Sequence, residues 1–210
     1  MKKFSITKLE EARRTPIKFA QTLLEGGSGS RVFGYPKSVR WLDAVGVCHD
    51  TSSVSTATNS LVNAFSNRKD TAKNRREVEQ LIQALETYVE EHQQLGYFYL
   101  ERRFNLEILL SPKIRITGWI WLLNMTANGG RSGYLVSKDI TGFDWQDELR
   151  FPIIQDYIAN EIYGCNLEDV EVGIIDYLTG NHHRTQYTEK DIALATEELT
   201  EIGDKITTII

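Results

Sequence analysis

IRITGWIWLL, residues 114–123, is an apolar, β-rich run that decides the fold of this chain. Its branched and aromatic side chains favour a strand over a helix. The tight-turn signal NGG follows at residues 128–130, and YLVSK at residues 134–138 indicates a return strand. From Trp145 to Tyr163 the apolar residues recur at helical spacing. We therefore expect a hairpin followed by a helix between residues 113 and 164.

The segments on either side of this hairpin complete the pattern. Residues 70–95 show the clearest helical periodicity, with Asp70 as the expected cap. Residues 97–110 alternate between apolar and polar side chains, which predicts a half-buried strand. The buried face of that strand is expected to carry Phe98, Leu100, Phe104, Leu106 and Ile108. Further expected elements are two helices within residues 5–25, helices at 38–49, 53–65 and 188–206, and a strand at 170–177.

The length and order of these elements predict a single domain over residues 1–210. A chain of 210 residues is long enough for one hydrophobic core. Residues 1–95 are expected to be mainly helical, and residues 96–210 to form a β-sheet core with flanking helices. The expected fold class is thus α/β, of the α+β type, with a central mixed sheet of about four to five strands.

The composition predicts an ordinary globular protein of the cytoplasm. The net charge is −5, so any contact with nucleic acid requires a local basic patch. The sequence contains no apolar run of membrane-spanning length and no apolar signal region near Met1, so we expect no membrane partner. Cys48 and Cys165 lie far apart and are expected to be unpaired thiols. Two cysteines are too few to hold an iron–sulfur cluster.

The hairpin and its helix resemble the core of the RecB-like branch of the PD-(D/E)XK nucleases. In that family one strand carries Gly-x-x-acid and the next ends in acid-x-Lys, and an amphipathic helix follows. The resemblance implies a restriction-endonuclease-like core in which the two acids hold a divalent metal and the lysine steadies the attacking water. Here Gly118 is followed by Trp121 in the first acid position, and Val136 takes the second. Only Lys138 remains of the triplet.

Other family positions match only in part. Glu101 lies on the strand before the Gly-x-x-acid strand, where relatives carry a glutamate that joins the metal site. His49 ends a helix where relatives place a histidine near the metal, and a histidine that contacts helix-end carbonyls is the other interpretation. A second motif register, IIDYLTG at residues 174–180, keeps the acid Asp176 but replaces the lysine with Leu178. Both registers leave the triplet incomplete.

The leading interpretation is a catalytically impaired nuclease-like domain that acts as a nucleic-acid-binding or structural subunit and has no cofactor. Lys138 and Glu101 are the residues of its vestigial site, and no metal ligand is assigned. The expected contacts to DNA phosphates are Arg13, Arg14, Lys18, Arg75, Arg76 and Arg103. Convergence of such cations would favour DNA as the partner, whereas dispersal would favour a protein.

Two alternatives stay open. The first is an active Mg²⁺-dependent DNA nuclease that uses Lys138 and relocated acids. The candidate acids are Glu101, Glu107, Asp139 and Asp176. The second is a protein-interaction module unrelated to nucleases.

Overall fold

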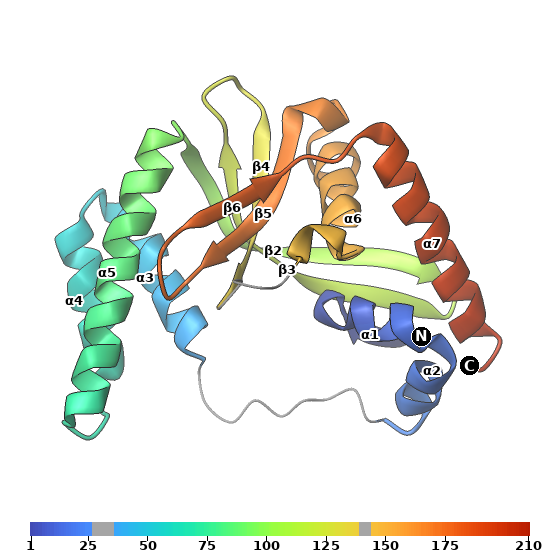
Figure 1. Ribbon diagram of the computed structural model, residues 1–210, viewed down its shortest axis with the longest axis horizontal. Coiled ribbons are helices and arrows are strands. Elements are labelled where there is room, and N and C mark those ends of the chain that lie inside the picture. The colour runs from blue at the N-terminus through green and yellow to red at the C-terminus, as the bar shows by residue number, and fades with distance from the viewer. Residues whose placement is uncertain (27–35, 139–143) are drawn as a thin grey trace.

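The computed structural model describes residues 1–26, 36–138 and 144–210, and these form a six-stranded mixed sheet with helices on both sides (Figure 1). The expected α/β class is confirmed. The strands are β1 (Lys2–Ser5), β2 (Phe98–Ser111), β3 (Ile114–Met125), β4 (Arg131–Ser137), β5 (Val170–Asp176) and β6 (His182–Thr185). The α-helices are α1 (Leu9–Arg14), α2 (Pro16–Leu24), α3 (Lys37–Thr51), α4 (Val54–Phe65), α5 (Ala72–Gln94), α6 (Arg150–Tyr157) and α7 (Glu189–Thr207).

The long strand β3 organises the sheet. It pairs with β2 in antiparallel fashion along nearly its whole length. On its other side it pairs first with β1, in parallel, and then with β4, in antiparallel fashion. β5 lies parallel to β4, and β6 pairs with β5 at the end of the path. Among the described strands β2 pairs only with β3, so β2 forms an edge of the sheet.

Two apolar clusters hold the helices to the sheet. Helices α3, α4 and α5, which we call the helical lobe, pack through Trp41, Leu61, Leu85 and Tyr88 against the sheet. Helices α1, α2, α6 and α7 lie on the other side of the sheet (Figure 1) and contribute to the second cluster, which includes Phe19 and Phe151. In the described part of the chain, no helix has the length and apolar character needed to cross a membrane.

Two strands were not predicted. β1 is four residues long and only Phe4 is buried in it, so its sequence shows too little alternation to reveal a strand. β6 consists of His182, His183, Arg184 and Thr185, which are polar residues at the sheet edge. Each strand is stabilised by pairing to a long neighbour, which is tertiary information.

The predicted burial of the β2 side chains is wrong for its first half. Phe98 is 59% exposed and Leu100 is 42% exposed, whereas Tyr97 is buried. The register shifts between Tyr99 and Glu101, and such a bulge moves the side chains before it to the opposite face. Beyond it, Arg103 adopts a left-handed backbone with a φ of 59°.

The helix predicted between residues 145 and 163 is divided into pieces. A short 3₁₀ turn at Trp145–Asp147 precedes α6, and a π-helix at Ile158–Tyr163 continues it. Pro152 is the third residue of α6, where its missing N–H is tolerated. The side chain of Gln155 is buried and donates hydrogen bonds to the carbonyls of Leu167 and Tyr187. Gln155 therefore fixes α6 to the segment that enters α7.

Replacing Gly180 with alanine is expected to destabilise the fold by about 2 kcal/mol more than replacing Gly129. Both glycines have a left-handed φ, 86° and 84° respectively. A Cβ at Gly180 would lie 2.1 Å from the carbonyl oxygen of Ala84 in α5, whereas a Cβ at Gly129 meets nothing within 4 Å. Gly129→Ala thus isolates the backbone contribution. Urea unfolding of both variants measures the difference, and equal destabilisation would contradict the packing argument.

Candidate nucleic-acid interface

The residues in the expected nuclease motif do not form a polar cradle. Trp121 packs against both apolar clusters, and Val136 packs against the cluster of the helical lobe. Neither side chain offers an oxygen to a metal ion. Lys138 is exposed just beyond the end of β4, and its charge acts on Lys37 at the start of α3. The expected lysine therefore lies near another cation, Lys37.

Glu101 lies far from Lys138. It is exposed on the edge strand β2, where it pairs with Leu123, which in turn pairs with Gly133 of β4. Lys138 follows Gly133 by five residues, which places it about 16 Å further along the strand direction. The charge of Glu101 acts instead on Tyr163. Burial is the main cause that raises the pKa of Tyr163, the charge of Arg131 lowers this pKa, and the charge of Glu101 raises it. Glu101 thus belongs to the opposite end of β4, and the structure does not bring the two predicted residues together.

The acids named for an active nuclease have other partners. Glu107 pairs with Arg115 and Lys3, and these cations lower the pKa of its carboxyl. Asp176 is buried, and its carboxylate accepts a hydrogen bond of 2.9 Å from the N–H of Leu178. Asp139 lies outside the described residues. No group of three or more His, Cys, Asp or Glu side chains in the described chain is arranged to hold a metal ion. The described donors therefore do not fit a magnesium site.

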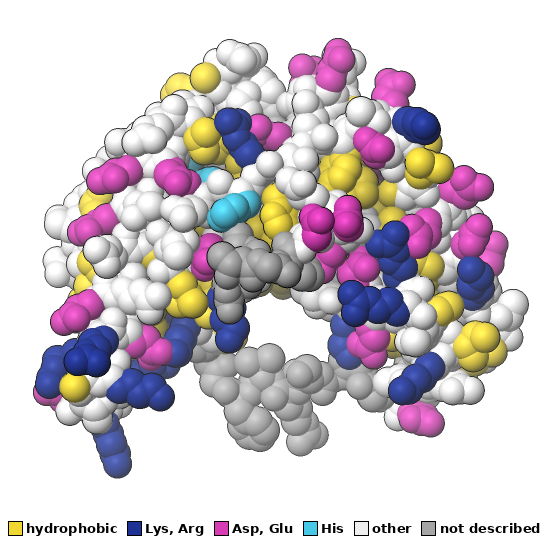
Figure 2. Space-filling model, in the orientation of Figure 1, with side chains coloured by type: hydrophobic (Ala, Val, Ile, Leu, Met, Phe, Trp, Pro, Cys, Tyr) yellow, Lys and Arg dark blue, Asp and Glu magenta, His cyan; other side chains and the backbone are white. Residues whose placement is uncertain are grey.

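A dense group of cations lies instead at one end of the helical lobe. We call it the basic tip, and it consists of Lys37, Arg40, Arg68, Lys69, Lys73, Arg75, Arg76 and Lys138. These residues come from the start of α3, the turn between α4 and α5, the first turns of α5 and the end of β4. Lys and Arg side chains gather at the lower left of Figure 2, over this end of the lobe.

Several contacts hold the basic tip in place. The guanidinium groups of Arg40 and Arg68 lie over the ring of Phe65, at 5.0 Å and 4.5 Å from its centre. Arg68 also donates a 2.6 Å hydrogen bond to Glu77, which pairs with Lys37 as well. Phe65 and Glu77 thus act as the centre around which cations from two segments are fixed.

Burial and the neighbouring cations act together on Lys37 in the basic tip. Burial lowers the pKa of Lys37, and the nearby charges of Arg68, Lys73 and Lys138 lower it further. A site in which cations depress the pKa of one of their number favours an added anion.

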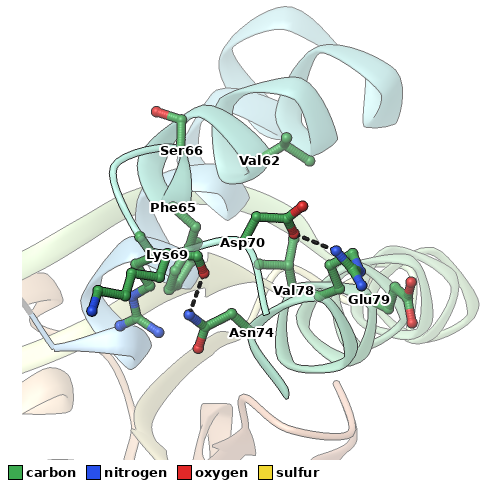
Figure 3. Close-up of a pocket in the computed structure, with 10 residues that line it drawn as sticks. Val62, Phe65, Ser66, Lys69, Asp70, Asn74, Val78 and Glu79 are labelled. Carbon is green, nitrogen blue, oxygen red and sulfur yellow. Dashed lines mark hydrogen bonds and ion pairs between the residues drawn. The ribbon is translucent and has the colours of Figure 1, made fainter. Parts of the chain in front are cut away.

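A pocket of about 320 Å³ opens within the basic tip, between the end of α4 and the start of α5 (Figure 3). Val62, Phe65 and Val78 provide its apolar part. Its charged part consists of the side chains of Arg68, Lys69, Asp70, Arg75 and Glu79. Arg75 is paired with Asp70, and the side-chain amide of Asn74 donates to the carbonyl of Lys69. The lining of the pocket therefore combines apolar and charged side chains.

The six cations predicted to contact DNA do not form one surface. Arg75 and Arg76 belong to the basic tip. Arg13, Arg14 and Lys18 lie on α1 and α2, across the sheet from the helical lobe (Figure 1). Arg13 donates two hydrogen bonds to Glu198 of α7, at 2.7 Å and 2.9 Å, which fixes α1 to α7.

Arg103 has a different role from the tip residues. Together with Arg102 it contacts the carboxylate of Asp43 in α3, at 2.8 Å and 3.0 Å respectively. These pairs join the edge strand β2 to the helical lobe. The six predicted residues are therefore dispersed over three parts of the molecule, and a different set of cations converges.

A buried cluster of histidine and tyrosine rings lies between the helical lobe and the sheet, and no pattern in the sequence indicates it. His49 is hydrogen-bonded through Nε2 to the Tyr88 hydroxyl at 2.8 Å and stacks on Tyr99. His92 donates through Nε2 to Asn124, and His182 donates through Nδ1 to Glu91. The rings come from α3, α5, β2 and β6, so no spacing along the chain links them.

Burial controls the charge of this cluster. It lowers the pKa of His49 to about 4, with a contribution from His92. It also lowers the pKa of His182 to about 4, against the opposing effect of Glu91. The contacts of His49 are thus to aromatic rings and a hydroxyl, and not to helix-end carbonyls. At neutral pH these rings are uncharged and serve as packing and hydrogen-bonding groups.

Comparison with known proteins yields no relative that defines the function. No protein-family model and no curated protein matches this sequence. Among solved structures, the crystal structure of SSO0001 shares 12% sequence identity, with 93% of this chain and 86% of that chain covered and a TM-score of 0.30. A likeness at that level supports no argument about fold or activity.

Proposed function

We propose that this protein binds the phosphate backbone of nucleic acid through the basic tip and does not cleave it. The observation that carries the proposal is the convergence of eight Lys and Arg side chains from separate segments at one end of the helical lobe. Phosphate contacts by clustered cations supply most sequence-independent affinity for nucleic acid.

The charge distribution supports this proposal. The chain as a whole carries −5, so a general attraction to polyanions is not available. Within the basic tip the cations outnumber the acids that lie among them, which are Asp70, Glu77 and Glu79. An anionic polymer is therefore expected to approach this end of the molecule and to be repelled elsewhere.

The proposal of binding without cleavage rests on the residues in the motif positions. Trp121 and Val136 replace the two metal-binding acids that the resemblance to the RecB-like nucleases implies. The remaining Lys138 is then one more cation at the basic tip. In this proposal a residue that would position water in an active nuclease contacts phosphate instead.

Binding is expected to weaken steeply with salt. If the tip contacts about five phosphates, the logarithm of the association constant should fall with the logarithm of salt concentration at a slope near −4. Fluorescence anisotropy with a labelled DNA oligonucleotide between about 50 and 300 mM salt measures this slope. The labelled DNA should stay intact when Mg²⁺ or Mn²⁺ is added. Absence of binding would refute the proposal, and cleavage that Lys138→Ala abolishes would favour the active-nuclease alternative.

A further inference from the structure

We infer that the pocket in the basic tip receives one unpaired base, so that the ligand is single-stranded nucleic acid. This inference rests on the proposed function and specifies its ligand. The pocket adjoins the cations that are proposed to hold phosphates, since Arg68, Lys69 and Arg75 line it. Its volume of about 320 Å³ lies at the small end of the range of ligand pockets, which suits one planar group.

The lining of the pocket favours a base over a phosphate. The apolar part of the lining is Val62, Phe65 and Val78, which cannot solvate an anion. Asp70 and Glu79 also line the pocket, and their carboxylates would repel a phosphate placed inside. A nucleobase is neutral and flat, and its amino groups can donate to those carboxylates. The phosphates on either side of the base would then lie over the exposed cations Lys69 and Lys73.

A stacking surface is available at the same place. Arg68 is held by the Phe65 ring on one side and by Glu77 through its guanidinium nitrogen. A fixed, planar guanidinium is a surface on which bases stack. Val62 is 44% exposed, so its apolar surface is available for contact with a base. A cationic surface combined with stacking and apolar contact is typical of single-strand binding sites.

Duplex DNA cannot use this pocket without a cost. Its bases are stacked and paired, and extruding one of them is unfavourable. We therefore expect a single-stranded 20-nucleotide oligomer to bind about tenfold more tightly than the same sequence in a duplex. Both forms are compared by anisotropy at the same salt concentration, so that salt affects the phosphate contacts of both forms under the same conditions.

Val62→Gln tests the pocket without changing the charge of the tip. It should remove most of the single-strand preference and leave duplex binding unchanged. Leu194→Gln is the matched control, because Leu194 is 55% exposed on α7, across the sheet from the tip. Equal binding of both forms, with a steep salt dependence, would overturn the base pocket and leave the proposed function standing. Absence of binding to either form would overturn both.

Discussion

Arg75→Glu combined with Arg76→Glu is expected to weaken binding of a nucleic-acid oligomer about a hundredfold at roughly 0.1 M salt. Both side chains are exposed in the first turns of α5, within the basic tip. The double change replaces two attractive charges with two repulsive ones beside the remaining cations. The salt slope should fall with the affinity, because fewer counterions are released.

This loss can be separated from a loss of structure. Glutamate near the start of a helix interacts favourably with the helix dipole, so α5 is not expected to unfold. The ion pair of Arg75 with Asp70 is exposed and contributes little to stability. Lys190→Glu with Lys205→Glu makes the same charge change on α7 and should leave binding nearly unaffected. An equal loss in both double variants would show that net charge, and not the tip, governs binding.

Acid is expected to destabilise this protein by roughly 5 kcal/mol between neutral pH and pH 4. The cause is the buried ring cluster, in which the pKa values of His49 and His182 are each lowered from 6.5 to about 4. Each such shift corresponds to roughly 3 kcal/mol, and the partial exposure of His49 reduces its share. Other titrating groups add to the total acid effect, so the histidine contribution requires variants.

The sign follows from which state binds protons. Above about pH 6.5 the histidines are neutral in both states, and their contribution to stability is fully present. As the pH falls towards 4, the two histidines bind protons in the unfolded chain but stay neutral in the folded chain. The free energy of unfolding therefore declines. Below about pH 4 the folded histidines also become protonated, so the decline from this source ends.

Urea unfolding measured at several pH values tests this expectation. His49→Gln and His182→Gln should each flatten the dependence of the unfolding free energy on pH between 4 and 6.5. His183→Gln is the matched control, because His183 is an exposed neighbour on the same strand. A pH profile that is unchanged in His49→Gln and His182→Gln would show that the cluster does not control acid stability.

The predictions from sequence succeeded where one element carries its own signal. The β-rich run and the turn signal of the β3–β4 hairpin gave both strands, and the helices expected at residues 53–65 and 188–206 correspond to α4 and α7. The residue that caps α5 is Thr71 and not Asp70, so the predicted cap is displaced by one residue. Local rules settle such features because the partners are close in sequence.

The basic tip could be predicted only in part, because its residues come from segments that are distant in sequence. Arg75 and Arg76 stand out on α5, but Lys37, Arg40 and Lys138 reach the tip through the packing of α3 and β4 against it. Arg13 appeared equally suitable on its own helix, and its partner Glu198 lies 185 residues away. Charge alone does not distinguish a binding residue from one that joins two helices.

The bulged edge strand β2 has a consequence for the behaviour of the protein in concentrated solution. A straight edge of fourteen residues would invite a second chain to add its own strand and to begin an aggregate. Glu101 and Glu107 place charge along that edge, and the left-handed backbone at Arg103 interrupts its hydrogen-bonding row. The charges and the irregular backbone of β2 are thus expected to disfavour the addition of a strand from a second copy of this chain.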